Sequence, residues 1–237
     1  MGIPTVTDMS IPTSMTEISA TTALVRLVTW LSPAFPTGAF SYSGGLEQAV
    51  QDGLLKDATD LEGWLSLVIE RGSGWNDAVL LAESYRAVDD AERLLAVIEL
   101  AEALAGSRER HMETLLQGEA FIEAASHWPH PVLALLGSKT AYPVAVGAVA
   151  GAHATGLEPV LAAYLHAQAS NAVSAAIRCG VTGQRGGVGV LARLETLVTA
   201  TAAKASESSL DHLGSAGIAV DIAALRHETL GSRLFRS

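Results

Sequence analysis

The sequence is poor in cysteine, in aromatic residues and in basic residues. Among 237 residues there is one cysteine, Cys179, and there are four each of Trp, Tyr and Phe. A single cysteine excludes a disulfide within the chain, which is typical of a reducing compartment, so we expect a cytoplasmic protein. The 25 Asp and Glu exceed the 15 Lys and Arg, for a formal net charge of −10. Because a nucleic-acid-binding protein needs a basic face, this balance argues against a nucleic-acid partner.

Long apolar segments are also missing. The first 20 residues have neither a basic stretch nor an apolar core, so they do not resemble a signal peptide, and we predict a flexible tail over residues 1–20. The most apolar run, residues 142–157, is interrupted by Pro143 and His153. It is shorter than the roughly 20 residues that span a bilayer, so we predict a buried helix there and no membrane partner.

The motifs of several enzyme classes do not occur. There is no GxxxxGK[ST] phosphate loop and no HExxH zinc motif. In the glycine-rich run 180–189 we expect Gly180 to end a helix and the later glycines to form a turn. SYSGG at 41–45 differs from the GxSxG elbow at Ser41 and follows a predicted helix, which leaves a serine hydrolase using Ser43 only as an alternative. We therefore predict a protein that is not an enzyme and that has no cofactor.

Apolar residues recur at helical spacing over nearly the whole chain after residue 21, while strand-like alternation is nearly absent. Short connections between helices favour antiparallel neighbours, so we predict an all-α fold, a single-domain multi-helix bundle over residues 21–237. Asp60 is the predicted N-cap of the third helix. The first helix has one apolar face, formed by Leu24, Leu27, Val28 and Leu31. The predicted helices are 21–31, 46–53, 61–71, 76–88, 90–104, 108–127, 143–154, 158–178, 188–205 and 221–230.

A few small or polar residues allow two interpretations. His127 and His130 of the HWPH turn are suitable nickel ligands, so a nickel-binding metallochaperone is an alternative function. His127 also suits the negative end of a helix dipole, and on that interpretation no metal ligand is assigned. The spacing of Gly147 and Gly151 predicts the close approach of another helix. Cys179 is predicted to be a small core residue.

The most distinctive segment is LSPAFPTGAFSYSGGLEQAV, residues 31–50, whose two prolines and three glycines before Leu46 forbid a continuous helix. It resembles the N-terminal signature of the urease accessory protein family UreF, S-P-x-x-P-x-G-x-F-x-Y-S-x-G-L-E. The residues that carry this resemblance are Ser32, Pro33, Pro36, Gly38, Phe40, Tyr42, Ser43, Gly45, Leu46 and Glu47.

The other end of the chain, LRHETLGSRLFRS, resembles the terminal pattern of the same family, H-E-x-L-x-S-R-L-F-x-S. The matching residues are His227, Glu228, Leu230, Ser232, Arg233, Leu234, Phe235 and Ser237. One stretch departs from the family: where members read R-E-L-R-x-E-S, residues 108–114 are Arg-Glu-Arg-His-Met-Glu-Thr, so Arg110 and His111 replace a leucine and an arginine.

The resemblance implies an all-α homodimer that acts with UreD (also called UreH) and the GTPase UreG on the urease apoprotein, to insert nickel without catalysing a reaction. It implies a docking tail over about 206–237, which we expect to be loose until it binds UreD. On the first signature, Phe35, Phe40 and Tyr42 are either interface anchors or plugs between helices. The partner-binding residues predicted on the loop are Ser32, Pro33, Pro36, Gly38, Phe40, Tyr42, Ser43 and Glu47, and those predicted on the tail are Arg226, His227, Glu228, Arg233, Leu234 and Phe235. The predicted dimer face contains Tyr164, Leu165 and His166.

Overall fold

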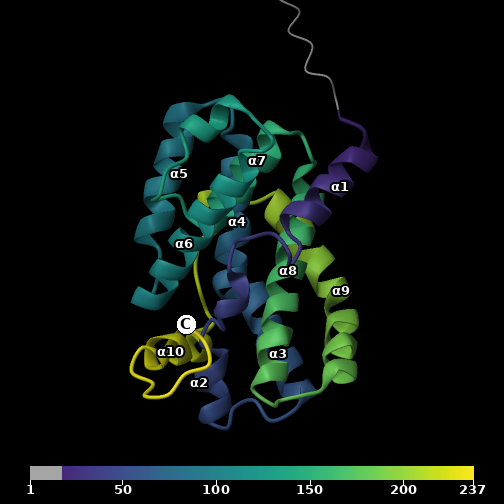
Figure 1. Ribbon diagram of the computed structural model, residues 1–237, viewed down its shortest axis with the longest axis vertical. Helices are drawn as coiled ribbons and strands as arrows, with labels where there is room; N and C mark the ends of the chain where they lie inside the picture. Colours follow the sequence, from purple (N-terminus) through teal and green to yellow (C-terminus); the bar gives the residue numbers. More distant parts are fainter. Residues whose placement is uncertain (1–17) are drawn as a thin grey trace, which may run out of the picture.

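The computed structural model describes residues 18–237, so the flexible tail predicted over 1–20 lies almost wholly outside the described residues. Ten α-helices and three short 3₁₀-helices account for the regular structure of residues 18–237, which contain no strand, and the all-α prediction is confirmed (Figure 1). The α-helices are α1 (Ala20–Trp30), α2 (Leu46–Gln51), α3 (Ala58–Arg71), α4 (Ser73–Arg86), α5 (Ala91–Ala103), α6 (Arg108–Ala125), α7 (Tyr142–Ala152), α8 (Leu157–Arg178), α9 (Gln184–Ser206) and α10 (Ile218–His227). The 3₁₀-helices are η1 (Ala39–Ser41), η2 (Pro131–Ala134) and η3 (Leu210–His212). In this described part of the chain, no helix is both long and apolar enough to cross a membrane.

Side-chain caps set several helix starts. The Asp57 carboxylate accepts the backbone N–H groups of Thr59 at 2.7 Å and Asp60 at 3.1 Å, so α3 begins at Ala58. These hydrogen bonds hold the pKa of Asp57 below its ordinary value. The prediction of Asp60 as the cap was wrong, because Asp57 reaches the free N–H groups first and Asp60 binds the N–H of Lys56 instead.

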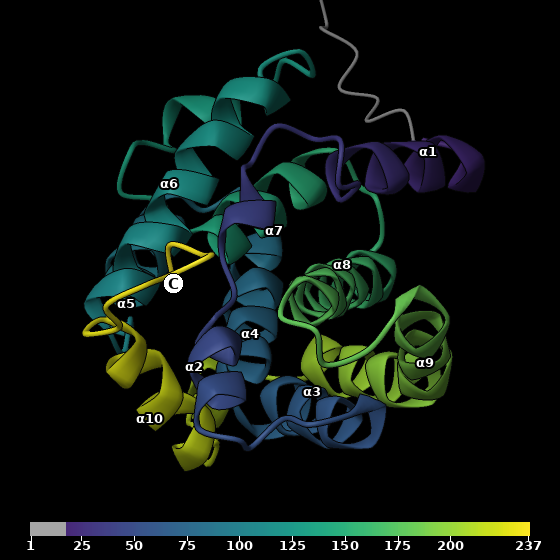
Figure 2. The same cartoon turned by 60° about the horizontal axis from the view of Figure 1, so that its bottom comes forward.

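Helix α4 lies at the centre of the molecule and contacts α3, α7 and α8, as Figure 2 shows. Its tightest packing is against α7, where glycines replace side chains. A Cβ at Gly147 would lie 2.1 Å from Oγ of Ser84, and one at Gly151 would lie 2.5 Å from the carbonyl oxygen of Tyr85. The prediction that these two glycines admit a second helix is therefore confirmed.

The long helices α8 and α9 form a hairpin through the glycine-rich run. Gly180, with φ of +79°, directly follows Cys179, the C-cap of α8, so its predicted role as a helix terminator is confirmed. The predicted turn was right for Gly183, the N-cap of α9, and wrong for the glycines after it, since α9 already begins at Gln184. Gly187 is needed inside α9, because a Cβ there would lie 2.8 Å from Cγ1 of Val173 on α8. Cys179 is half-buried.

Helix α1 lies at the edge of the molecule, and its inner face is narrower than predicted. Leu27 and Trp30 are buried, whereas Leu24 and Val28 are 60% and 63% exposed. Val25 is also 60% exposed. The predicted single buried face was therefore half right, because α1 covers one side of the bundle and no other element within residues 18–237 covers its outer side.

Candidate functional site

The two segments that carry the family signatures lie side by side, although most of the chain separates them. They are the loop of residues 31–45, between α1 and α2, and the C-terminal segment of residues 228–237, which runs back toward α2 after α10 (Figure 1). The N–H of Ser43 donates to the main-chain oxygen of Ser237 at 2.7 Å, and the Ser43 hydroxyl donates to the same oxygen. The N–H of Arg236 donates to the carbonyl oxygen of Ser41 at 2.8 Å. These hydrogen bonds join the loop and the C-terminal segment into one continuous surface.

Glu47, in the first turn of α2, holds the C-terminal segment in place. Its carboxylate accepts the backbone N–H of Leu234 at 2.8 Å and that of Phe235 at 3.1 Å. The other contact is with Nε2 of His227, at 3.2 Å. Glu47 is only 5% exposed, so a buried carboxylate is satisfied almost entirely by groups from the other end of the chain.

His227 is fully buried between two carboxylates. Its Nδ1 lies 2.7 Å from Glu109, and the second oxygen of Glu109 accepts a hydrogen bond from Arg233. We call Glu47, Glu109, His227 and Arg233 the clasp. It joins α2, α6, α10 and the C-terminal segment, so the predicted tail residues His227 and Arg233 make internal contacts. In this structure these contacts fold the C-terminal segment against the protein, so the loosening expected of the tail before it binds UreD would have to break them.

Helix α10 approaches the start of α2 through a glycine. Gly45 has φ of +82°, in the left-handed region. A Cβ there would lie 2.6 Å from the backbone nitrogen of Ala224. Gly45 of the signature is therefore required for two reasons: its φ is positive, and the backbone of α10 leaves no room for a Cβ.

Helix α8 fixes the loop and the C-terminal segment from the other side. The Asn171 side-chain amide donates to the carbonyl oxygens of Ala39 at 3.0 Å and Tyr42 at 3.3 Å. Arg178 donates to the carbonyl oxygen of Phe40 at 2.5 Å, and its guanidinium lies 4.0 Å above the ring of Phe235. Sequence reasoning missed Asn171, Arg178 and Glu109, since no local spacing marks contacts between residues more than 100 positions apart.

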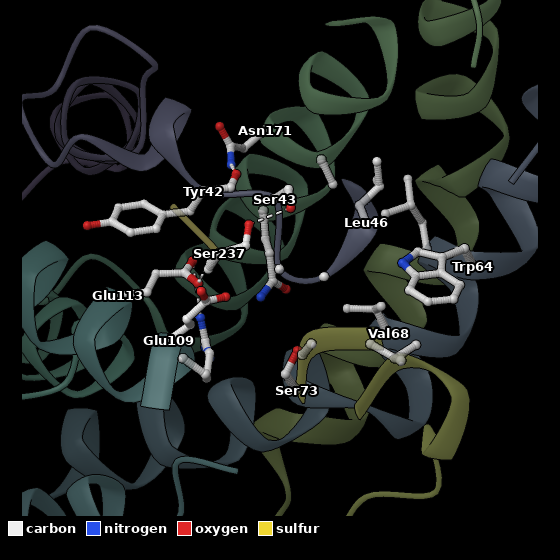
Figure 3. A pocket seen from close by; sticks show the side chains of 18 of the residues that line it. Tyr42, Ser43, Leu46, Trp64, Val68, Ser73, Glu109, Glu113, Asn171 and Ser237 are labelled. Atoms are coloured by element: carbon white, nitrogen blue, oxygen red, sulfur yellow. Dashed lines mark hydrogen bonds and ion pairs between the residues drawn. The ribbon is translucent and has the colours of Figure 1, made fainter. Parts of the chain in front are cut away.

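Behind the loop is a small cavity of about 110 Å³. Ser237 lies between Ser43 and Glu113 in this cavity, and its hydroxyl donates to Glu113 at 3.0 Å (Figure 3). Burial raises the pKa of Glu113, although the guanidinium of Arg110 lies 3.4 Å away and opposes that shift. The C-terminal segment is thus also connected to α6.

Arg110, which stands where the family has leucine, turns its guanidinium into the protein. It binds Asp77 at 2.5 Å, and Asp77 also accepts the hydroxyl of Tyr164 at 2.9 Å. Desolvation beside the Asp77 charge raises the pKa of Tyr164 well above its ordinary value. His111, at the arginine position, lies 3.8 Å from Glu102. The departure from the family pattern therefore forms a buried ion pair of Arg110 with Asp77.

A groove of about 680 Å³ runs between α1, the loop and α8. Leu24, Val28 and Pro33 line its apolar wall, and His166 lines the α8 side. Of the predicted dimer residues, only His166 is exposed, because Tyr164 is 3% exposed and Leu165 is fully buried. Placing Tyr164 and Leu165 on a dimer face was wrong, since both side chains pack inward from α8.

The aromatic residues of the loop divide between the two predicted roles. Phe35 packs against Phe121 with ring centroids 5.5 Å apart, and Tyr42 is 5% exposed, so both fill gaps between helices. Phe40 is 66% exposed at the edge of the groove and is free to act as an anchor. The remaining predicted loop residues are Ser32, Pro33 and Pro36, half-exposed or exposed in the groove wall, and Gly38, which lines the groove with φ of +72°.

The remaining predicted tail residues are mostly engaged within the chain. Arg226 pairs with Asp52 at 2.6 Å, and Glu228 accepts the N–H of Arg108 at 2.8 Å. Phe235 is buried, whereas Leu234 is 67% exposed. Of the six predicted residues, Leu234 therefore offers the most apolar surface to a partner.

The residues of the two alternative functions have other contacts. Nδ1 of His130 accepts the N–H of Val132 at 3.2 Å, as the N-cap of η2, while His127 lies exposed after α6. No group of three or more His, Cys, Asp or Glu side chains that could hold a metal ion occurs between residues 18 and 237. The Ser43 hydroxyl binds Ser237, and both ring nitrogens of the nearby His227 are engaged by carboxylates. Ser43 thus lacks the adjacent base that a nucleophile needs.

The fold and the site define an all-helical protein whose candidate contact surface is built jointly by both ends of its chain. The family model described as UreF matches residues 55–195. Urease accessory protein UreF of Sinorhizobium medicae is 67% identical over 223 residues, which is 94% of this chain and 100% of that relative. The proteins of the same name from Rhizobium meliloti and Brucella ovis are 65% and 56% identical, over 94% and 97% of this chain and 100% of each relative. The chain belongs to the UreF family of urease accessory proteins.

Proposed function

We propose that this chain is a non-catalytic assembly factor that acts with UreD (UreH) and the GTPase UreG on the urease apoprotein, to insert nickel in the cytoplasm. The observation that carries the proposal is the clasp, Glu47, Glu109, His227 and Arg233. It joins the two segments that the family resemblance assigns to partner binding. A surface built in this way suits a protein that holds partners in a defined orientation, since its parts are fixed before binding.

The clasp also supports communication between partners. Glu47 belongs to the loop side and binds the backbone of Leu234 and Phe235. A partner that moves the C-terminal segment therefore acts directly on Glu47 and, through Ser43, on the loop. Coupling of this kind needs a contiguous set of contacts, and the hydrogen bonds between the two ends form one.

The groove supports the proposed homodimer. A two-fold dimer uses the same patch on both copies, so the patch must contain a projection and a recess that match. Leu24, Val25 and Val28 form an exposed apolar ridge on α1, and Leu24 and Val28 also line the recess beside it. His166 lies on the opposite wall. We assign this face to the second copy.

Co-expression with UreD, UreG and urease, followed by size-exclusion chromatography and nickel analysis, tests the function. We expect one complex that contains all the accessory proteins, and nickel in the urease. Deletion of residues 226–237 should abolish association with UreD. Leu234→Ala, which removes no hydrogen bond of the clasp, should weaken it while the fold is retained. Full association of the deletion variant would contradict the docking role of the C-terminal segment.

The same purified chain tests the two alternatives. Hydrolysis of ester or amide substrates that is lost in Ser43→Ala would favour an enzyme. Nickel binding in equilibrium dialysis that is lost when His127 and His130 are both replaced by Ala would favour a metallochaperone. We expect the double replacement of His127 and His130 to leave the nickel content of urease unchanged in the co-expression experiment.

A further inference from the structure

The last four residues of the C-terminal segment alternate between exposed and buried side chains. Leu234 and Arg236 are exposed, whereas Phe235 and Ser237 are each 4% exposed. Such alternation is typical of an extended peptide, in which successive side chains point to opposite sides. Phe235 and Ser237 therefore face the protein, as the anchoring residues of a bound peptide do.

The backbone of these residues is held by groups that are far away in the sequence. The three N–H groups of residues 234–236 donate to the carboxylate of Glu47 and to the carbonyl oxygen of Ser41. The main-chain oxygen of Ser237 accepts the N–H of Ser43 at 2.7 Å. Hydrogen bonds to the main chain give affinity for an extended peptide whatever its sequence. A peptide from another protein could therefore make the same hydrogen bonds.

Two side-chain contacts add selectivity to these backbone contacts. The guanidinium of Arg178 lies 4.0 Å from the centre of the Phe235 ring. The hydroxyl of Ser237 donates to Glu113 at 3.0 Å. An aromatic side chain is thus recognised at one position, and a second side chain two residues later. We call the groups that hold residues 234–237 the segment site: Ser41, Ser43, Glu47, Glu113 and Arg178.

The chain's own residues do not fill this site. The cavity of about 110 Å³ has Ser237 on one side and, on the other, an apolar wall that includes Leu46, Trp64 and Val68 (Figure 3). A serine side chain is too small to cover that wall, whereas a large aliphatic side chain at the same position would bury against it. The segment site therefore suits a ligand that differs from the chain's own sequence at this position.

A short exposed connection precedes residues 233–237. Thr229, Gly231 and Ser232 are exposed, and Leu230 is half-buried. The N–H groups of Thr229 and Leu230 donate back to the last turn of α10. Exposed connections of this kind open at a low cost in free energy. Residues 233–237 can therefore leave the segment site while α10 stays in place.

We propose that the segment site is a peptide-binding site, which residues 233–237 occupy in the free chain as a removable internal ligand. Its external ligand is a segment of another protein with an aromatic side chain and, two residues later, a large aliphatic one. A second copy of the chain fits less well. Its own residues 233–237 are tethered beside their own site, at an effective concentration of about millimolar, and they have serine at the aliphatic position.

Fluorescence anisotropy of a labelled peptide with the sequence of residues 228–237 tests the site. The full-length chain is used as wild type, as Phe235→Ala, which removes the anchor of the internal ligand, and as Leu234→Ala, the matched change at the exposed neighbouring position. We expect Phe235→Ala to bind the peptide at least about 10-fold more tightly than the wild type does, because the internal ligand no longer competes. Leu234→Ala should stay within about 2-fold of the wild type.

Changes in the peptide test the selectivity. A peptide with Phe235→Ala should not bind to the Phe235→Ala chain. A peptide with Ser237→Leu should bind about 10-fold more tightly than the unchanged peptide, because leucine covers the apolar wall of the cavity. Arg178→Ala, added to the Phe235→Ala chain, should weaken binding of the unchanged peptide, which would locate the peptide at the segment site.

The same measurements can overturn the inference. Equal binding by the wild type, Phe235→Ala and Leu234→Ala would place the peptide elsewhere, and no binding by any of them would mean that no peptide site exists. A Ser237→Leu peptide that binds no better than the unchanged one would contradict the assigned ligand. If the wild-type chain bound Phe235→Ala more tightly than it binds itself, the ligand would be a second copy and the inference would fail.

Two further points keep the test decisive. If circular dichroism shows that Phe235→Ala does not fold, Arg236→Pro replaces it, because proline removes the N–H that donates to Ser41 and leaves the buried Phe235 in the sequence. The experiment contains no other urease component. Its failure would therefore leave the proposed function untouched, and failure of the co-expression experiment would leave the peptide site untouched.

Discussion

At the scale of single residues, Glu47 has the largest set of contacts between the two ends of the chain. Its carboxylate accepts two backbone N–H groups and faces His227, in an environment that excludes water. Hydrogen bonds to a buried charge are stronger than those between neutral groups, and losing them leaves the donors unsatisfied. A conservative replacement should therefore have a large effect here.

Glu47→Gln should lower the free energy of unfolding by about 2–3 kcal/mol, because an amide N–H₂ would face backbone donors. Trypsin should also cleave faster at Arg233 and Arg236 as the C-terminal segment detaches. Urea unfolding and timed proteolysis measure the two effects. Glu99→Gln on the exposed side of α5 is the control. Equal stability and equal cleavage in the two variants would show that Glu47 does not hold the segment.

Glu113 predicts a dependence of stability on pH. Its pKa in the folded protein is raised above the ordinary value of 4.5, mainly by burial. Between 4.5 and the raised pKa the folded state binds more protons than the unfolded state, so the contribution of Glu113 to stability falls as pH rises through this interval. Glutamine does not titrate, so the unfolding free energy of Glu113→Gln, minus that of the wild type, should increase from pH 4.5 upward. Urea unfolding of both proteins over a series of pH values measures this difference. If the unfolding free energies of the two proteins changed with pH in parallel, Glu113 would not be the source of the pH dependence.

At the scale of elements, the position of α10 depends on the start of α2. Both Gly44 and Gly45 have positive φ, but only Gly45 touches another element. Alanine replacements at the two positions therefore separate the energetic cost of backbone strain from the cost of steric overlap with α10. It also shows why a single residue of the signature can control a helix about 180 positions later in the chain.

Gly44→Ala should cost about 1–2 kcal/mol, the strain of a left-handed backbone. Gly45→Ala should cost a further ~1–3 kcal/mol, because its Cβ would overlap the backbone of α10 at Ala224. Guanidinium unfolding gives both values, and hydrogen exchange of α10 amides reports whether α10 moves. The same loss in both variants, with unchanged exchange, would mean that α10 does not depend on Gly45.

At the scale of the whole molecule, one end carries the clasp and α10, and another face carries the α1 ridge and the groove. The proposed homodimer uses the second of these surfaces. Val28 on α1 and Val188 on α9 are 63% and 65% exposed, so the same substitution at both positions differs only in location.

Val28→Glu should convert the dimer to a monomer in sedimentation velocity, because dimerisation would bury an unpaired charge. Val188→Glu should sediment as the wild type does. A dimer that persists in Val28→Glu would place the two-fold interface elsewhere on the protein.

The helical elements were largely predictable because helix propensity, apolar spacing and capping are local properties. The errors also have local causes. Asp60 was predicted as the cap of α3, but Asp57 is an equally suitable capping residue, and only the backbone conformation of Asp57 makes it the cap. Gly187 was assigned to a turn because its contact with Val173 on α8 is not visible in the order of residues.

The candidate site was predictable only as two separate segments. Their signatures supplied the predicted partner-binding residues and the resemblance to the family. That Glu47 binds His227, Leu234 and Phe235, and that Arg178 bridges Phe40 and Phe235, could not be predicted, since these contacts depend on how α2, α8 and α10 pack.

The sequence by itself thus determined the fold class, the approximate helices and the family, because each depends on local patterns or on residues at fixed spacing. Only the tertiary structure decided that the two signatures form one surface, that Tyr164 and Leu165 face inward, and that the outer side of α10 is exposed and aliphatic. The physical reason is that burial is a property of the packed chain. A leucine or an isoleucine has the same side chain in the core and on an interface, and only its neighbours in space distinguish the two.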